Sequence, residues 1–357
     1  MATYASIRYK FSGANVSGVL QASNNLNDVG AAATSRTNLG VAIGSDVQAF
    51  ISATAGITAA SISETAITIS SAFGALNTDG AAGINLTGVL ITLQDTITTT
   101  NAGSVTITNS GTLTIEEAAN MVVDGAFNQN GAGSVDLAAT IVTSGGDIHF
   151  AGDVSLEDIA TLVTAGGDIT FDSTVDGGFA LTMNAGAGNI EMTGAVGSAV
   201  RLGLLTVADA ADVTFAGSVA AISVQQNAGT GTTTFSSTIN TNVAAGVSLT
   251  GAAFSFDGAI TTTGTGSFTL VNTGVATFSD NLTLDGAFNQ SGGGVVELSS
   301  DISTTGDAIY FGSAVTLKTD VSMITSGGSI EFAGNVNGDT IGGQSLERSE
   351  EHTSELQ

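Results

Sequence analysis

Two aspartates and one histidine are the residues of this chain whose types and spacing could support catalysis. Asp147 and Asp168 occupy the same position in two similar segments, Gly146-Asp147-Ile148-His149-Phe150 and Gly167-Asp168-Ile169-Thr170-Phe171. Two carboxyl groups about 5 Å apart suit a retaining glycosidase, so carboxylates stacked in neighbouring repeats could hydrolyse a glycan. Aspartate is also an ordinary turn former, and that interpretation is favoured.

His149 is the one histidine that precedes the C-terminal segment 348–357. No nucleophile elbow or other local motif completes a Ser–His–Asp arrangement around it, so we expect a solvent-facing strand residue. The glycine-rich segments 131–133 and 292–294 do not lie in a strand–helix phosphate loop. The sequence therefore predicts a protein that is not an enzyme, with no cofactor and with no catalytic, cofactor-binding or metal-ligating residue.

Composition narrows the partners that this chain could take. The net charge is -26, with only six lysines and arginines, and there is no cysteine. A polyanionic surface repels phosphate, which argues against nucleic acid and anionic membranes as partners. The absence of cysteine excludes a disulfide framework and a thiolate metal site. Solubility is the ordinary explanation of the charge, and binding of divalent cations is the alternative. No apolar run reaches the roughly 18 residues of a membrane helix, so no membrane insertion is expected.

Internal repetition is the strongest signal in the sequence. Asp124-Gly125-Ala126-Phe127-Asn128-Gln129 recurs as Asp285-Gly286-Ala287-Phe288-Asn289-Gln290. Upstream, Gly83-Ile84-Asn85-Leu86-Thr87-Gly88 resembles Gly246-Val247-Ser248-Leu249-Thr250-Gly251. A long unit thus starts near Gly83 and again near Gly246, and the second copy stops short. Residues 54–82 are expected to form a transition of short strands and small-residue links.

A finer period lies inside this unit, because Phe150, Phe171 and Met192 follow one another at equal spacing. Short alternating runs of Thr, Val, Ile and Phe, broken by Gly, Asn and Asp, indicate strands and turns. The step of about 21 residues is the size of one solenoid coil. The predicted fold is therefore all-β, an elongated parallel β-solenoid or β-helix, preceded by a small mixed N-terminal segment.

The constant step also predicts where side chains point, because strand residues alternate between two faces. Ile148, Ile169 and Ile190 should form one inner stack, and Phe150, Phe171 and Met192 another. His149, Thr170 and Glu191 should form one outward column. The glycines at 145, 146, 166 and 167 should mark corners that need positive φ or close approach.

Two family resemblances support this picture. Residues 83–346, through the stretch from Phe179 to Ile190 and the two hexapeptides, resemble the β-strand repeats of filamentous-haemagglutinin-like bacterial surface proteins. Residues 25–40, with their continuation 43–50, resemble a short motif of bacteriophage tail fibres. The first resemblance implies a β-repeat fold and carries no binding residues. The second implies an attachment role, with a capping segment for the solenoid as its alternative.

The C-terminal segment differs from the rest of the chain. Residues 348–357 resemble the translation of a sequencing-adapter oligonucleotide, and we expect the natural protein to continue beyond them. The expected organisation is an attachment or capping segment over 1–82, a solenoid over 83–347 and an artefactual tail over 348–357.

Three function classes follow from these observations. The leading one is a structural fibre or spacer of a phage tail or virion surface, and the absence of a signal-peptide h-region near Met1 favours it. The second is a fragment of a secreted bacterial adhesin, and the third is a polysaccharide-depolymerising tailspike. The expected location is the virion, the extracellular space or the cell surface. The expected partners are a cell-surface glycan or receptor and further copies of the chain in a fibre.

Overall fold

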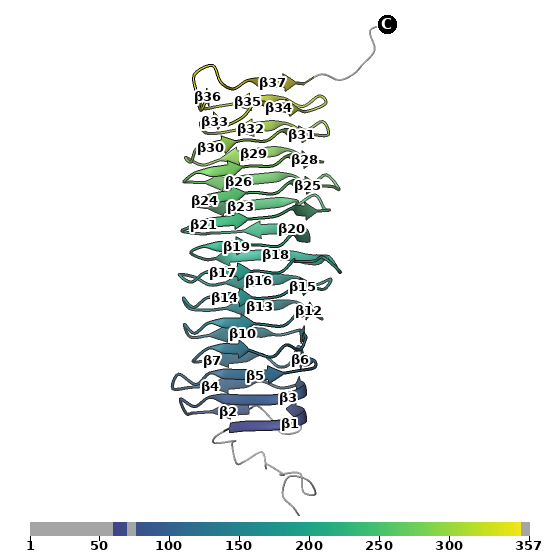
Figure 1. The fold of residues 1–357 in the computed structure, drawn as a ribbon, viewed down its shortest axis with the longest axis vertical. Coiled ribbons are helices and arrows are strands. Elements are labelled where there is room, and N and C mark those ends of the chain that lie inside the picture. The colour runs from purple at the N-terminus through teal and green to yellow at the C-terminus, as the bar shows by residue number, and fades with distance from the viewer. Residues whose placement is uncertain (1–59, 70–75, 351–357) are drawn as a thin grey trace, which may run out of the picture. The chain divides into compact units, whose positions relative to one another are not determined.

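The computed structural model describes residues 60–69 and 76–350, which form one parallel β-solenoid (Figure 1). The chain divides into two compact units, residues 1–52 and 53–357, and all described residues belong to the second. Every strand pairing in the described part is parallel, and no helix occurs there. The predicted fold class is confirmed. The expected mixed N-terminal segment and the tail-fibre-like motif lie outside the described residues.

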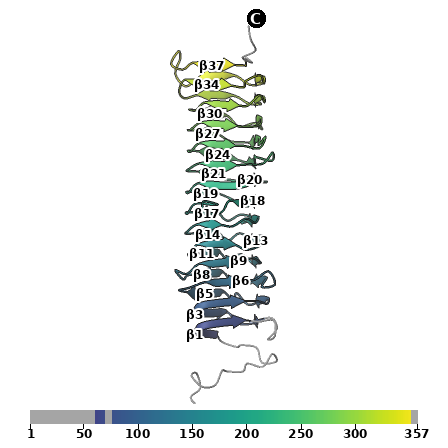
Figure 2. The same ribbon diagram turned by 90° about the vertical axis from the view of Figure 1, so that its right-hand side faces the viewer.

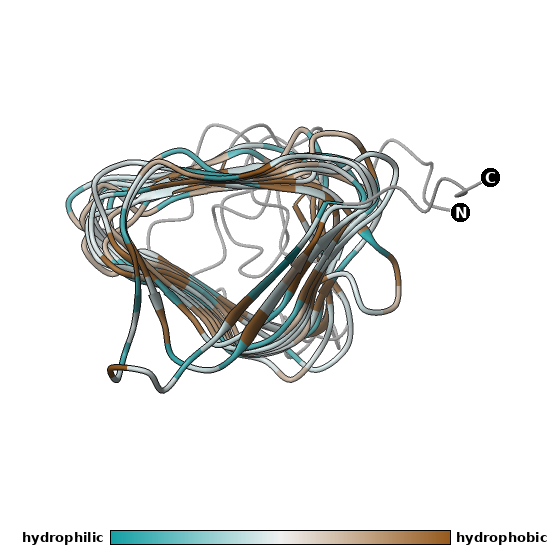
Figure 3. Ribbon diagram, turned by 90° about the horizontal axis from the view of Figure 1, so that it is seen from above, coloured by the Kyte–Doolittle hydropathy of each residue, from teal (hydrophilic) through white to brown (hydrophobic). Residues whose placement is uncertain are grey.

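Each coil carries three short strands on three faces, which are numbered here in chain order. Figure 3 looks along the solenoid axis and shows the three walls of successive coils lying over one another. In the side view of Figure 2, the strands of one face form a vertical column.

The strands of face 1 are β5 (Val105–Asn109), β8 (Phe127–Gln129), β11 (Ile148–Phe150), β14 (Ile169–Phe171), β17 (Ile190–Met192), β19 (Val213–Phe215), β21 (Thr232–Phe235), β24 (Ala253–Phe256), β27 (Ala276–Phe278), β30 (Val296–Leu298), β33 (Val315–Leu317) and β36 (Val336–Gly338). Those of face 2 are β6 (Leu113–Ile115), β9 (Val135–Leu137), β12 (Val154–Leu156), β15 (Val175–Asp176), β22 (Ile239–Thr241), β25 (Ile260–Thr262), β28 (Leu282–Leu284), β31 (Ile302–Thr304), β34 (Val321–Ile324) and β37 (Leu346–Ser349).

Face 3 comprises β2 (Leu76–Thr78), β4 (Ile97–Thr99), β7 (Met121–Val123), β10 (Thr140–Thr143), β13 (Ala160–Val163), β16 (Leu181–Asn184), β18 (Leu202–Asp209), β23 (Val247–Gly251), β26 (Phe268–Asn272), β29 (Phe288–Ser291), β32 (Ile309–Phe311) and β35 (Ile330–Phe332). Three longer strands turn a corner without a break: β1 (Ala60–Ile69) and β3 (Ile84–Leu93) cross from face 1 to face 2, and β20 (Val219–Gln226) crosses from face 2 to face 3.

The core is a set of axial stacks made by every second strand residue. Ile148, Ile169 and Ile190 lie in register and are buried, as predicted. Phe150 stacks on Phe171 with ring centroids 5.1 Å apart. No single coil encloses its apolar face, so stabilisation comes from contact between neighbouring coils.

Glycine shapes the corners between face 3 and face 1, as the sequence predicts. Gly145 has φ of 117°, a conformation that side chains rarely adopt. Gly146 is needed for a different reason: a Cβ there would lie 2.3 Å from the carbonyl oxygen of Gly125 in the preceding coil. Neighbouring coils can therefore approach closely at this corner only where the side chain is absent.

The coils extend beyond both ends of the expected solenoid range. Before the expected boundary at residue 83, β1 pairs with β3 from Ala60 onward. At the other end, β37 pairs with β34 as far as Ser349, so Arg348 and Ser349 of the expected tail continue a strand. Residues 351–357 lie outside the described residues.

The two copies of the hexapeptide lie on different faces of the solenoid. Phe127 is in β8 on face 1, whereas Phe288 is in β29 on face 3. Following the register upward from Phe127 takes seven coils to reach Ala276, and two further strands lead to Phe288. The unit is thus seven and two-thirds coils long, and its second copy is turned by two faces about the axis.

Candidate functional site

The aspartates of the candidate dyad belong to a ladder of hydrogen bonds between coils. The backbone N–H of Asp168 donates to Asp147 Oδ1 at 2.9 Å, and that of Asn189 donates to Asp168 Oδ1 at 2.7 Å. The ladder continues as the N–H of Asp212 donates to Asn189 Oδ1 at 3.1 Å and that of Thr232 donates to Asp212 Oδ1 at 2.7 Å. Each side-chain oxygen thus satisfies a corner amide of the next coil, as turn-forming Asx residues do.

The second copy of the unit does not repeat this pair of carboxylates. Its positions equivalent to Asp147 and Asp168 are Ala308 and Ser329. Asn189 shows that an amide oxygen serves in the ladder as a carboxylate does. The geometry therefore accounts for both aspartates as corner residues.

His149 lies on the outer surface of face 1, between Asn128 and Thr170 in register. The expected outward column of His149, Thr170 and Glu191 is confirmed. His149 Nε2 lies 2.9 Å from Asp172 Oδ2, and its side chain is 28% exposed. In the described residues the structure gives His149 no hydrogen bond to a hydroxyl nucleophile. The pair is an exposed polar contact between adjacent coils.

The two glycine-rich segments also have a structural explanation. A Cβ at Gly133 would lie 1.8 Å from the carbonyl oxygen of Gly111, and one at Gly294 would lie 1.8 Å from that of Gly274. Both segments are places where the backbone of one coil presses on the coil before it.

The hexapeptide is a corner module that both copies repeat. The N–H of Ala102 donates to Asp124 Oδ2 at 2.7 Å, and that of Thr265 donates to Asp285 Oδ2 at the same distance. Ala102 and Thr265 have φ of 61° and 62°, so each aspartate caps a left-handed turn in the preceding coil. The bonds from Thr265 and from the Thr305 hydroxyl hold the pKa of Asp285 below its usual value.

The glutamine of each module forms a buried polar pair with an asparagine of the preceding coil, which the sequence analysis missed. Gln129 Nε2 donates to Asn109 Oδ1 at 2.7 Å, and Gln290 Nε2 donates to Asn272 Oδ1 at 2.7 Å. All four side chains are fully buried at inward strand positions. A signal was available, because two polar residue types occur at the same inward positions in both copies. Burial of amides is tolerated when their hydrogen bonds are made. Because the two members of each pair belong to adjacent coils, their hydrogen bond favours the observed register of those coils.

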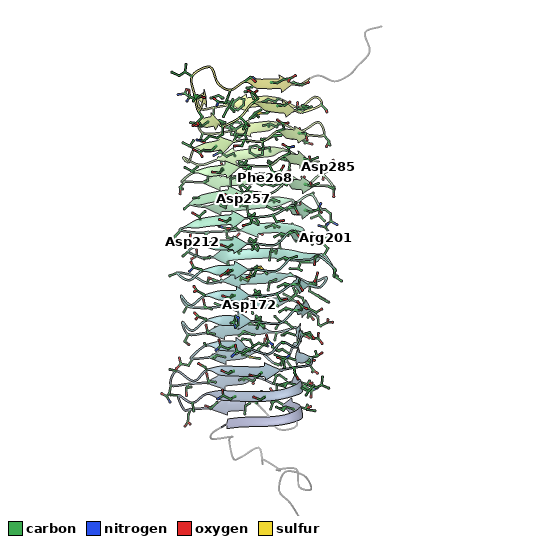
Figure 4. The ribbon with its side chains drawn as sticks, in the orientation of Figure 1. Asp172, Arg201, Asp212, Asp257, Phe268 and Asp285 are labelled. Atoms are coloured by element: carbon green, nitrogen blue, oxygen red, sulfur yellow. The ribbon has the colours of Figure 1, made fainter. Side chains whose placement is uncertain are left out.

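The outward positions of face 1 form a polar column along the solenoid axis. Along face 1 the column rising from Glu191 is Thr214, Thr234, Ser255, Thr277, Glu297 and Thr316. Figure 4 shows side chains projecting from the coils along the whole stack, with Asp212 at one side and Arg201 and Asp285 at the other. What this arrangement offers chemically is a long, hydroxyl-rich and acidic surface.

Arg201 is one of three basic residues that the structure describes on this acidic surface, with Lys318 and Arg348. Its Nη1 donates to the carbonyl oxygens of Ala221 at 2.9 Å and Asn240 at 2.7 Å, and its Nη2 donates to Asn240 Oδ1 at 2.5 Å. The guanidinium thus bonds to each of the two coils above its own and links the three coils together.

Metal ions and membranes are two further partners to consider. Over residues 60–69 and 76–350, no group of three or more His, Cys, Asp or Glu side chains is placed to hold a metal ion. None of these residues lies in a helix that is long and apolar enough to cross a membrane.

Comparison with known proteins leaves the resemblances to surface-protein repeats and tail fibres as expectations. No protein-family model, no curated protein and no solved structure matches the chain.

Proposed function

We propose that this chain is a non-catalytic rod, which serves as a spacer within an extracellular or virion fibre. The observation that carries the proposal is an uninterrupted stack of thirteen strands on face 3 within the described residues. It consists of the twelve face-3 strands from β2 to β35 and the second half of β20. At about 4.8 Å per coil, this stack spans roughly 60 Å. A continuous core of this kind resists bending, because every coil is bonded to the one above and the one below.

The use of polar residues supports a spacer. The corner aspartates are engaged in hydrogen bonds between coils, and the outward columns consist mainly of Thr, Ser, Asn and scattered carboxylates. An active site needs unlike groups that converge in one pocket, whereas this chain repeats similar groups along an axis. The strongly acidic surface keeps such a rod soluble.

The rod belongs, in this proposal, to a phage tail fibre or virion surface protein that contributes to host attachment. The tail-fibre-like motif at 25–50 favours this origin. A fragment of a large secreted bacterial adhesin is the alternative, because the repeats resemble those of filamentous-haemagglutinin-like proteins. A depolymerising tailspike would instead require the carboxylates of Asp147 and Asp168.

The test is a screen for glycan cleavage by the purified chain and by its Asp147→Asn and Asp168→Asn variants. Both substitutions keep an oxygen acceptor for the ladder, as Asn189 does, so the fold should persist. Asp212→Asn is the matched control, because Asp212 belongs to the same ladder but not to the candidate dyad. We expect no cleavage by any of the four proteins. Cleavage that is lost in the first two variants and kept in the control would overturn the proposal.

A further inference from the structure

The outward asparagine of the repeated hexapeptide is the starting point of this inference. The aspartate, glycine, phenylalanine and glutamine of the hexapeptide have structural roles as cap, close contact, core residue and buried pair. Asn128 and Asn289 are identical in the two copies, yet they point outward from β8 and β29. Their side chains make none of the side-chain hydrogen bonds found within the described residues. An amide with free donors and a free acceptor is a ready hydrogen-bonding group.

The neighbours of each asparagine are also alike in the two copies. On face 1, Asn128 lies in register between Thr106 below and His149 above. On face 3, Asn289 lies between Thr269 below and Tyr310 above. Both columns therefore present a hydroxyl, an amide and an aromatic ring on three successive coils, about 4.8 Å apart.

We propose that these columns, Thr106–Asn128–His149 and Thr269–Asn289–Tyr310, are two equivalent binding sites for a neutral glycan. The inference rests on the proposed function as a fibre and names the ligand class and the residues. Amide and hydroxyl groups pair with sugar hydroxyls, and a ring offers an apolar surface beside them. Asp172 lies against His149, and Glu331 follows Tyr310 in register, so negatively charged sugars are disfavoured at both sites.

The rotation of the repeat decides how the two sites are presented. Because the unit is seven and two-thirds coils long, the sites lie about 37 Å apart along the axis. They also face different directions, since one is on face 1 and the other on face 3. A flat glycan surface can therefore engage one site of a given rod at a time, whereas a dense or flexible glycan layer can engage both. Simultaneous engagement raises the overall affinity without any new contact.

The experiment titrates the full chain with soluble neutral oligosaccharides of hexoses and N-acetylhexosamines, chosen by a first screen on an array that also holds sialylated glycans. We expect two sites per chain. Asn128→Ala and Asn289→Ala should each leave one site, and the double variant should leave none. Binding to a dense glycan layer should weaken at least tenfold in each single variant. Thr214→Ala, outward on face 1 but outside both columns, is the matched control and should behave as the unmodified chain.

Four results would overturn the inference: no binding to any neutral oligosaccharide, preferential binding of sialylated glycans, a single site per chain, or binding that survives in the double variant. Melting curves of all variants should coincide, because the substituted side chains point outward. Failure of the two binding columns would leave the rod intact as a spacer. Conversely, glycan cleavage in the preceding screen would overturn the spacer and leave the binding columns standing.

Discussion

The two copies of the repeated unit share their inward contacts and differ in their outward charges. Asp136 and Glu157 of the first copy are replaced by Glu297 and Lys318 at the equivalent positions of the second. In the first copy, burial and the nearby Glu157 carboxylate raise the pKa of Asp136. In the second, Lys318 Nζ lies 3.0 Å from Asp339 and 3.2 Å from Glu297, and these contacts raise the pKa of the lysine. Duplication has thus kept the core modules while the surface has changed sign locally.

The comparison extends to smaller contacts. Thr112 and Ser134 of the first copy have hydroxyl oxygens 3.2 Å apart, and the equivalent residues of the second are Val275 and Val295, both exposed. Since a solenoid coil only needs its inward residues to match its neighbours, outward positions are free to vary. The inward residues of the two hexapeptide modules therefore define the fold. If the modules are equivalent, the same substitution should have a similar effect in both copies.

The largest expected effect comes from the core phenylalanine of the two modules. Phe127→Ala and Phe288→Ala should each destabilise the solenoid by about 3–5 kcal/mol. Phe288 should cost more, because its ring contacts Phe268, Phe278 and Phe311, whereas Phe127 contacts only Phe150 among described rings. Urea unfolding of the two variants measures the difference. Equal losses would mean that the aromatic contacts add nothing beyond burial.

A smaller effect is expected from the buried glutamines. Gln129→Ala leaves the amide of Gly152, now bonded to Gln129 Oε1 at 3.0 Å, without a partner, whereas the amide of Ala151 keeps its bond to the backbone carbonyl of residue 129. Gln290 accepts longer bonds from the Ser313 amide and hydroxyl, at 3.3 and 3.2 Å. The loss should be about 1–3 kcal/mol for each variant, and larger for Gln129. Hydrogen exchange in the two variants at Gly152 and Ser313 reports on each site, and a greater acceleration at Ser313 than at Gly152 would contradict this ranking.

The smallest effect concerns the exchanged charges. Glu157→Lys should stabilise the first copy by at most about 1 kcal/mol, and Lys318→Glu should destabilise the second. Because the folded chain holds the Asp136 proton more tightly than the unfolded chain, the contribution of Asp136 to stability should fall as pH rises from 3.8 to its raised pKa, and stay lower above it. Asp285, whose pKa is lowered, contributes in the opposite direction, so the comparison with Glu157→Lys isolates the part of Asp136. Melting temperatures measured from about pH 3.5 to about pH 7 test this, because the range brackets the titration of an aspartate. Glu157→Lys should flatten the change, and an unaltered profile would show that Glu157 does not act on Asp136.

Much of the fold could be predicted because the stacked coils of a parallel solenoid produce a regular residue spacing in the sequence. The stacks of Ile148 and Phe150, the outward column of His149 and the corner glycine at 145 follow from alternation combined with the step of 21 residues that these particular coils share. For Asp147 and Asp168, the sequence left two interpretations, turn formers or a catalytic pair. The hydrogen bond that each carboxylate accepts from a backbone amide of the next coil is visible only in the structure.

The sequence by itself determined the coil, its inward residues and the existence of the duplicated unit. Only the tertiary structure decided which face each copy occupies, because the number of residues per coil varies. Measured on face 1, one coil leads from Val296 to Val315 and another from Ile190 to Val213, and the corners accommodate the difference. The duplicated unit is longer than a whole number of coils, and the excess of two-thirds of a coil turns the second copy about the axis. The size of this excess can be calculated only from the register of every coil. It is this register, set by hydrogen bonds between coils, that turns Asn289 away from the face on which Asn128 lies.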